Sequence, residues 1–123
     1  MSINDEIIID LSYLIEVASG NNEFIVEMID IFLAQTPGHV DELNTAIQAK
    51  EWKRIAEVAH KIKPTLSFMG VESAKDVMAE IEKDARNEEN YENIVSKITQ
   101  MQAVFETIFL KLEAKKQELL LNN

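Results

Sequence analysis

Cysteine is absent from this chain of 123 residues, and helix-breaking residues are scarce, with three glycines and two prolines. The lack of cysteine excludes a disulfide framework and a thiolate metal site. Few glycines and prolines, in a chain that is 46% hydrophobic, are typical of a globular helical protein. No apolar run is long enough to cross a bilayer or to form a secretory signal, so we expect a cytoplasmic protein.

Positive charge is also scarce. Twelve lysines and arginines stand against 22 acidic residues, which gives a formal net charge of −10. Such a surface repels nucleic acid and anionic membranes, so we expect neither as a partner. The length suits one hydrophobic core and is too short for two, so residues 1–123 are predicted to form a single, monomeric domain.

Apolar residues recur at steps of three and four along most of the chain, and no segment alternates as a β-strand would. This pattern predicts an all-α fold, namely an antiparallel up-down four-helix bundle with a short additional N-terminal helix. The first expected helix is short, begins at Asp10 or Ser12 and ends at Gly20, and the second begins at Asn21 or Asn22 and runs for about 28 residues with a kink at Pro37. The third runs from Glu51 to Met69, and the fourth begins at Glu72 or Ser73. The last begins at Tyr91, and its tail, residues 115–123, is expected to fray.

One histidine stands at the edge of the apolar stripe of the third of these helices. His60 is about 100° from Ala59 around the helix, so its side chain should reach solvent. A neutral imidazole carries one unprotonated ring nitrogen with a free lone pair. Lys63 lies one turn further along the same face and can meet a negatively charged group there. The basic residues of this region gather around the histidine: Lys50, Lys53, Arg54, Lys61 and Lys63.

The segment from Ala59 to Gly70 resembles the signature of histidine-phosphotransfer (HPt) domains, the intermediate carriers of multistep phosphorelays. That signature reads His, any residue, apolar, Lys, Gly, small, Ser or Ala, three variable residues, then Gly. The matching positions are His60, Ile62, Lys63 and Gly70, whereas Pro64 stands where the family usually has glycine. Ser67 follows the Ser-or-Ala position of the signature by one residue. The resemblance extends over nearly the whole chain, because residues 10–20, Phe24 and residues 32–33 look like the family's first helix and the start of its second.

The resemblance implies a phosphocarrier. His60 would accept a phosphoryl group from the aspartyl phosphate of one receiver domain, in a hybrid histidine kinase, and pass it to the aspartate of another, in a response regulator. Lys63 would balance the phosphoryl charge. Mg²⁺ would be bound by the receiver alone, so we expect no cofactor here. The chain has no ATP-binding or kinase motif, and we therefore expect a carrier and not an enzyme.

Pro64 is the departure from the family pattern. A proline inside a helix donates no hydrogen bond, so the carbonyl of His60 loses its partner, and the ring crowds that carbonyl. We expect the helix to bend near His60 while the approach to the imidazole stays open. Ser67, two turns from His60, is expected to pack or to cap the backbone, and Gly70 to end the helix.

Three consecutive isoleucines, residues 7–9, precede the first helix. One interpretation is that they close the open end of the bundle. The other is that Ile8 and Ile9, with Leu14, form an apolar docking rim beside His60. The resemblance implies that a receiver domain is held by such a rim, mainly on the first three helices.

Two other classes of function are compatible with parts of the sequence. The same bundle could be a non-catalytic interaction or scaffold module in signalling, with His60 incidental, although a degenerate member would be expected to lose His60 first. A metal site is the other class, because Glu57 and His60 fit the Glu-x-x-His motif of di-iron bundles. Such sites need two motifs, and His39, the only other histidine, is preceded three residues earlier by Thr36. We therefore expect no metal, and His39 is interpreted as a surface or kink residue.

Overall fold

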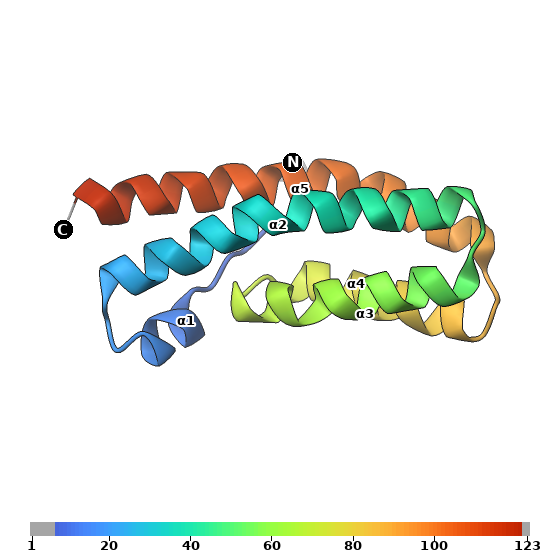
Figure 1. Ribbon diagram of the computed structural model, residues 1–123, viewed down its shortest axis with the longest axis horizontal. Helices are drawn as coiled ribbons and strands as arrows, with labels where there is room; N and C mark the ends of the chain where they lie inside the picture. The colour runs from blue at the N-terminus through green and yellow to red at the C-terminus, as the bar shows by residue number, and fades with distance from the viewer. Residues whose placement is uncertain (1–6, 122–123) are drawn as a thin grey trace.

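The structure is a computed structural model that describes residues 7–121, and its helices form an antiparallel bundle (Figure 1). The long helices contact one another in a ring, in which α3 packs on α2 and α4 while α5 packs on α2 and α4. The all-α fold class expected from the periodicity is confirmed. The helices are α1 (Ser12–Val17), α2 (Asn22–Gln48), α3 (Trp52–Phe68), α4 (Glu72–Arg86) and α5 (Tyr91–Leu121).

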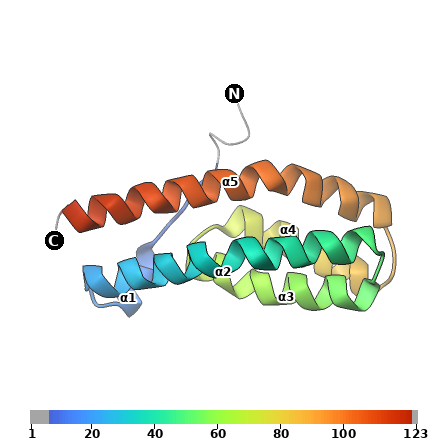
Figure 2. The same ribbon diagram turned by 45° about the horizontal axis from the view of Figure 1, so that its top comes forward.

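Two long helices form one side of the bundle. Figure 1 shows α2 and α5 running along each other, with the shorter pair α3 and α4 packed beside one half of their length. Helix α1 lies next to the other half of α2, beyond the ends of α3 and α4, and Figure 2 shows the same arrangement from a second direction. Helix α3 therefore has neighbours on both sides, α2 and α4.

The two ends of α1 and the start of α2 follow the capping signals in the sequence. The side chain of Asn21 accepts a hydrogen bond from the Phe24 N–H at 3.1 Å and so caps α2. Gly20 adopts a positive φ of 74° and donates its N–H to the Ile15 carbonyl, which ends α1 as predicted. Asp10 accepts from the Ser12 N–H at the other end of α1, and the hydroxyl and N–H of Ser12 lower the pKa of the Asp10 carboxyl.

The two prolines both lie inside continuous helices. Helix α2 runs through Pro37, and Figure 1 shows its axis changing direction near its middle, in keeping with the expected kink. Helix α3 runs from Trp52 to Phe68 through Pro64 without interruption. A local bend at His60 stays a prediction, but Pro64 does not end the helix.

The last helix is longer than expected. The sequence suggested fraying from Lys115 onward, but α5 continues to Leu121, and that expectation is wrong over this range; residues 122–123 lie outside the described part. Lys116 forms an ion pair with Asp30 of α2 at 2.8 Å, which ties this end of α5 to the start of α2. Long-range pairing of this kind cannot be read from local periodicity.

The segment before α1 crosses the bundle and is held at two points. Ile7 is buried and its carbonyl accepts a hydrogen bond from the Lys111 side chain at 2.6 Å. The Asp10 N–H donates to the Gly70 carbonyl at 3.0 Å. Ile7 therefore helps to close the core, as one of the two interpretations held, whereas Ile8 is exposed. Among residues 7–121, no helix is long and apolar enough to cross a membrane.

Gly70 is predicted to be indispensable for stability, for a reason that the structure makes specific. Its φ is +71°, and a Cβ added there would lie 1.7 Å from the carbonyl oxygen of Asp10. We expect Gly70→Ala to lower the free energy of unfolding by roughly 2–4 kcal/mol, because both the left-handed backbone and the clash oppose it. Urea unfolding followed by circular dichroism measures this.

Gly38 provides the matched control, because it lies inside α2 and a Cβ there would meet nothing within 4 Å. Gly38→Ala should raise the free energy of unfolding by about 0.5–1 kcal/mol through its higher helix propensity. Equal effects of the two substitutions would contradict the close contact between Gly70 and Asp10.

Candidate functional site

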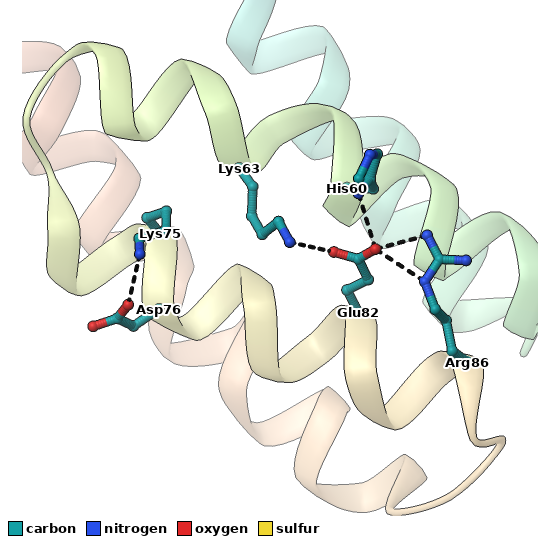
Figure 3. Close-up of polar contacts among 6 residues, drawn as sticks. All are labelled: His60, Lys63, Lys75, Asp76, Glu82 and Arg86. Carbon is teal, nitrogen blue, oxygen red and sulfur yellow. Dashed lines mark hydrogen bonds and ion pairs between the residues drawn. The ribbon is translucent and has the colours of Figure 1, made fainter.

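His60 projects from the middle of α3 toward α4, and its side chain is 62% exposed (Figure 3). Its neighbours Ala59 and Ile62 are fully buried and anchor that turn of α3 in the core. The imidazole is thus presented on a helix whose other face is fixed by packing. This is the exposed position at the edge of the apolar stripe that the helical periodicity predicts.

Glu82 of α4 is the direct partner of the imidazole. Its Oε2 atom lies 2.9 Å from Nδ1 of His60, and its side chain is only 9% exposed. An ionised carboxylate can only accept hydrogen bonds, so Nδ1 must be the donor. In the neutral ring, the unprotonated nitrogen with its lone pair is then Nε2. The contact therefore fixes both the orientation and the tautomer of His60.

Two cations hold the carboxylate of Glu82. Lys63 of α3 places its Nζ 2.7 Å from Oε1. Arg86, one turn beyond Glu82 on α4, donates from Nε at 2.9 Å and from Nη2 at 2.6 Å to Oε2. Figure 3 shows the three side chains converging on Glu82 from the two helices. The site is thus a charged cluster that spans α3 and α4.

The pKa of Glu82 reflects this cluster. Burial alone would raise the pKa of the carboxyl, but the hydrogen bonds from Lys63 and Arg86, together with the charges of Lys63 and His60, outweigh burial and lower the pKa to about 2. The carboxylate is therefore ionised at neutral pH, as the assignment of the Nδ1 proton requires.

Sequence reasoning missed Glu82 and Arg86. The apolar periodicity of α4 shows an amphipathic helix, and the spacing along α3 relates His60 only to residues of that same helix. One signal was present: Glu82 follows buried Met78 by one turn and adjoins buried Ile81, so a charge falls on the inner side of α4. An acidic residue at such a position needs a cation, and Arg86 stands at the i+4 position that can supply one.

Most of the basic side chains expected around His60 contact other residues instead. Arg54 and Lys61 both pair with Glu42 of α2, the latter at 3.4 Å. Lys50 lies over the ring of Tyr91, 4.8 Å from its centroid, at the end of the bundle. Of the lysines and arginines that we grouped around His60, Lys63 is the one that joins its cluster. Fewer positive charges therefore lie beside His60 than the positions of these residues in the sequence suggest.

Pro64 is exposed and lines a cleft between α2 and α3, which we call the α2–α3 cleft. The cleft has a volume of about 280 Å³. Because Pro64 follows His60 by one helical turn, the cleft adjoins the face that presents the imidazole. Its lining is mostly apolar and includes Met28, Ile31, Phe32, Pro64 and Phe68, with His39 at its edge.

The remaining predicted residues are placed as follows. Leu14 is fully buried, so its assignment to an exposed docking rim is wrong. Ile9 is half-buried in a depression that also contains Lys111 and Lys115 of α5, away from His60 on α3. Ser67 is half-buried, and its carbonyl accepts the Gly70 N–H at 3.0 Å.

The metal alternative finds no support in the geometry. Glu57 is exposed, and the carboxylate that contacts His60 belongs to Glu82. Within residues 7–121, no group of three or more histidine or acidic side chains is arranged to hold a metal ion. Lys63 and Arg86 already form ion pairs with the carboxylate that a metal would need.

The charged cluster predicts a specific acid sensitivity. Because the folded-state pKa of Glu82 is depressed from 4.5 to about 2, its carboxylate adds stability above pH 4.5 that is lost as the pH falls toward 2. The shift corresponds to about 3 kcal/mol. The difference in unfolding free energy between the native protein and Glu82→Gln should shrink by roughly 2–3 kcal/mol between pH 5 and pH 2.

Urea unfolding at a series of pH values measures this difference. Glu106→Gln, which removes an exposed carboxylate from α5, is the control and should show a nearly constant difference over the same range. A constant difference for Glu82→Gln as well would contradict the buried, ionised carboxylate.

Comparison with known proteins identifies the family. The family model of the Hpt domain matches residues 27–111, which include the His60 cluster and the α2–α3 cleft. The phosphorelay intermediate protein rdeA of Dictyostelium discoideum is 30% identical over 80 residues, which are 65% of this chain and 32% of that protein. The match thus spans about a third of the relative's length, and no solved structure is matched. Since the family model covers more than half of the chain, this protein belongs to the Hpt domain family.

Proposed function

We propose that this protein is the histidine-containing phosphocarrier of a multistep phosphorelay and that His60 carries the phosphoryl group between receiver-domain aspartates. The single observation that supports this most strongly is the contact of His60 Nδ1 with ionised Glu82, which leaves Nε2 as the nucleophilic nitrogen of an exposed side chain. The name of the relative, a phosphorelay intermediate protein, agrees with this function.

The transfer chemistry follows from the tautomer. The Nε2 lone pair forms a bond to the phosphorus of an aspartyl phosphate, and the acyl P–O bond breaks with its electron pair passing to the aspartate carboxylate. The Nδ1 proton stays on the ring. The positive charge that the ring gains then lies 2.9 Å from an oxygen of Glu82, which stabilises it. Return of the phosphoryl group to a second aspartate reverses each of these changes.

Rate enhancement in such a reaction comes chiefly from positioning and electrostatics. The bundle fixes α3 by its buried face, and Glu82 fixes the rotation of the imidazole ring, so little conformational freedom is lost on reaction. The receiver supplies Mg²⁺ and the remaining stabilisation of the transition state. The carrier itself needs no nucleotide and no metal in this scheme.

The receiver is expected to dock over the α2–α3 cleft and α1. Tyr13 of α1 is exposed and packs edge-on against Phe68, which lines the cleft, at 5.7 Å between ring centroids. Ile31 of α2 and Pro64 of α3 are exposed on the same cleft. A continuous apolar surface beside a reactive residue is typical of a protein docking site. This surface replaces the rim of Ile8, Ile9 and Leu14.

The partners that fit this scheme are the receiver domain of a hybrid histidine kinase and that of a response regulator, each engaged by a monomeric carrier. The competing class is a scaffold module that binds the same partners without chemistry. The two differ in one observable property, since a scaffold would retain its activity when His60 is replaced by glutamine.

His60 is predicted to be the sole site of phosphorylation. Incubation with phosphoramidate, a small phosphodonor, should add one phosphoryl group that is labile in acid and stable in base, as phosphohistidine is. His60→Gln should abolish this uptake, whereas His39→Gln, which changes the other histidine, should leave it unchanged. Intact-mass measurement gives the result, and acid-labile phosphate on His60→Gln would refute the assignment.

The docking surface is predicted to govern transfer from a receiver but not from a small donor. Ile31→Asp places a charge in the α2–α3 cleft and should slow transfer from a phosphorylated receiver about tenfold or more, while phosphorylation by phosphoramidate stays unchanged. Leu110→Asp, an equally drastic change at an exposed position of α5, is the control. Autoradiography of reactions stopped at successive times measures the transfer rate to each variant. A larger effect of Leu110→Asp than of Ile31→Asp would place the docking surface elsewhere.

A further inference from the structure

The carboxylate of Glu82 divides its partners between its two oxygens. Oε1 faces Lys63 at 2.7 Å, whereas Oε2 receives the Nδ1 of His60 and both donors of Arg86 (Figure 3). Lys63 and Arg86 therefore do not compete for the same atom. Either cation can leave without disturbing the contacts of the other.

The two cations differ in what they can reach. Lys63 lies on α3, three residues from His60 and on the same helical face, and its ammonium sits on a flexible four-carbon stem. Arg86 lies on α4 and is fixed by two hydrogen bonds to Oε2 from its planar guanidinium. Lys63 is thus the cation that can turn toward a group on Nε2, and Arg86 the one suited to stay with the carboxylate.

Phosphorylation of His60 adds negative charge beside the carboxylate of Glu82. The new phosphoryl group carries roughly two negative charges, and it arrives next to an ionised carboxylate. Lys63, which is 29% exposed, is drawn toward the phosphoryl oxygens and away from Oε1. Glu82 is 9% exposed, so water cannot fully replace the ammonium that leaves.

We propose that Arg86 is a positioning residue that holds Glu82 when Lys63 moves from Glu82 to the phosphoryl group on His60. With Arg86 in place, the carboxylate keeps two charge-assisted hydrogen bonds at Oε2, and Lys63 is free to leave Oε1. Without Arg86, the departure of Lys63 would leave the buried carboxylate with the Nδ1–H of His60 as its remaining side-chain partner, and this cost would keep Lys63 on Glu82. This proposal rests on the proposed function of His60. It states that Arg86, through Glu82 and Lys63, controls how long the phosphoryl group stays on His60.

The test compares four proteins phosphorylated by phosphoramidate: the native chain, Lys63→Ala, Arg86→Gln and the double variant. Hydrolysis of the phosphohistidine is followed by ³¹P NMR. Each single variant should shorten the lifetime by roughly three- to tenfold, the effect expected for loss of one nearby charge. The double variant should be no shorter-lived than Lys63→Ala, because Arg86 acts through Lys63. If the double variant shortened the lifetime by the product of the two single effects, the proposal would be overturned.

Lys83→Gln is the matched control, because it removes one exposed positive charge from the same helix, α4. Its phosphohistidine lifetime should equal that of the native chain. Arg86→Lys retains the charge without the paired donors and should restore the lifetime only in part. It also serves as the test variant if Arg86→Gln proves unfolded by circular dichroism.

A second readout follows Lys63 directly. The ¹H and ¹³C signals of its ε-methylene should shift on phosphorylation of the native chain, and this shift should be smaller in Arg86→Gln. An unchanged shift would mean that Lys63 moves without Arg86 and would overturn the inference. The two levels of failure are distinct: no phosphoryl uptake by His60 refutes the proposed function, whereas uptake with Arg86→Gln behaving as Lys83→Gln refutes the division of roles alone.

Discussion

The buried carboxylate of Glu82 organises the His60 cluster of this protein. Glu82 is buried on α4, and an ionised carboxylate in that position is stable only if cations and donors surround it. Lys63 and Arg86 provide the positive charge, and His60 provides the third contact. The orientation of the histidine is thus a consequence of satisfying the carboxylate. The same contact between α3 and α4 leaves Nε2 as the nitrogen that would react in the proposed transfer.

In the proposed function, the rest of the fold presents this cluster to a receiver domain. The segment before α1 is fixed by the carbonyls of Ile7 and Gly70, and it places α1 at the end of α3, where Tyr13 meets Phe68. The apolar surface made by α1 and the α2–α3 cleft therefore depends on a glycine that tolerates close backbone approach. The stability of the N-terminal segment and the proposed docking of a receiver are connected through that one contact.

Much of the fold was predictable because it depends on local signals. Asn21, Gly20 and the apolar steps along α3 each determine a helix boundary or a buried face from neighbours within a turn or two. His60 and Lys63 were found for the same reason, since both lie on one helix. Glu82 and Arg86 were missed because their importance arises only when α4 packs beside α3. Leu14 was wrongly expected on an exposed rim because its burial depends on how α1 packs against the bundle.

In the proposed function, contact between Nδ1 of His60 and Glu82 leaves Nε2 as the atom that carries the phosphoryl group. Two-dimensional ¹H–¹⁵N NMR of the phosphorylated protein, labelled at histidine, distinguishes the two nitrogens by their coupling to phosphorus. We expect a phosphorus coupling at Nε2 of His60 and a proton on Nδ1. A phosphoryl group on Nδ1, or on His39, would contradict it.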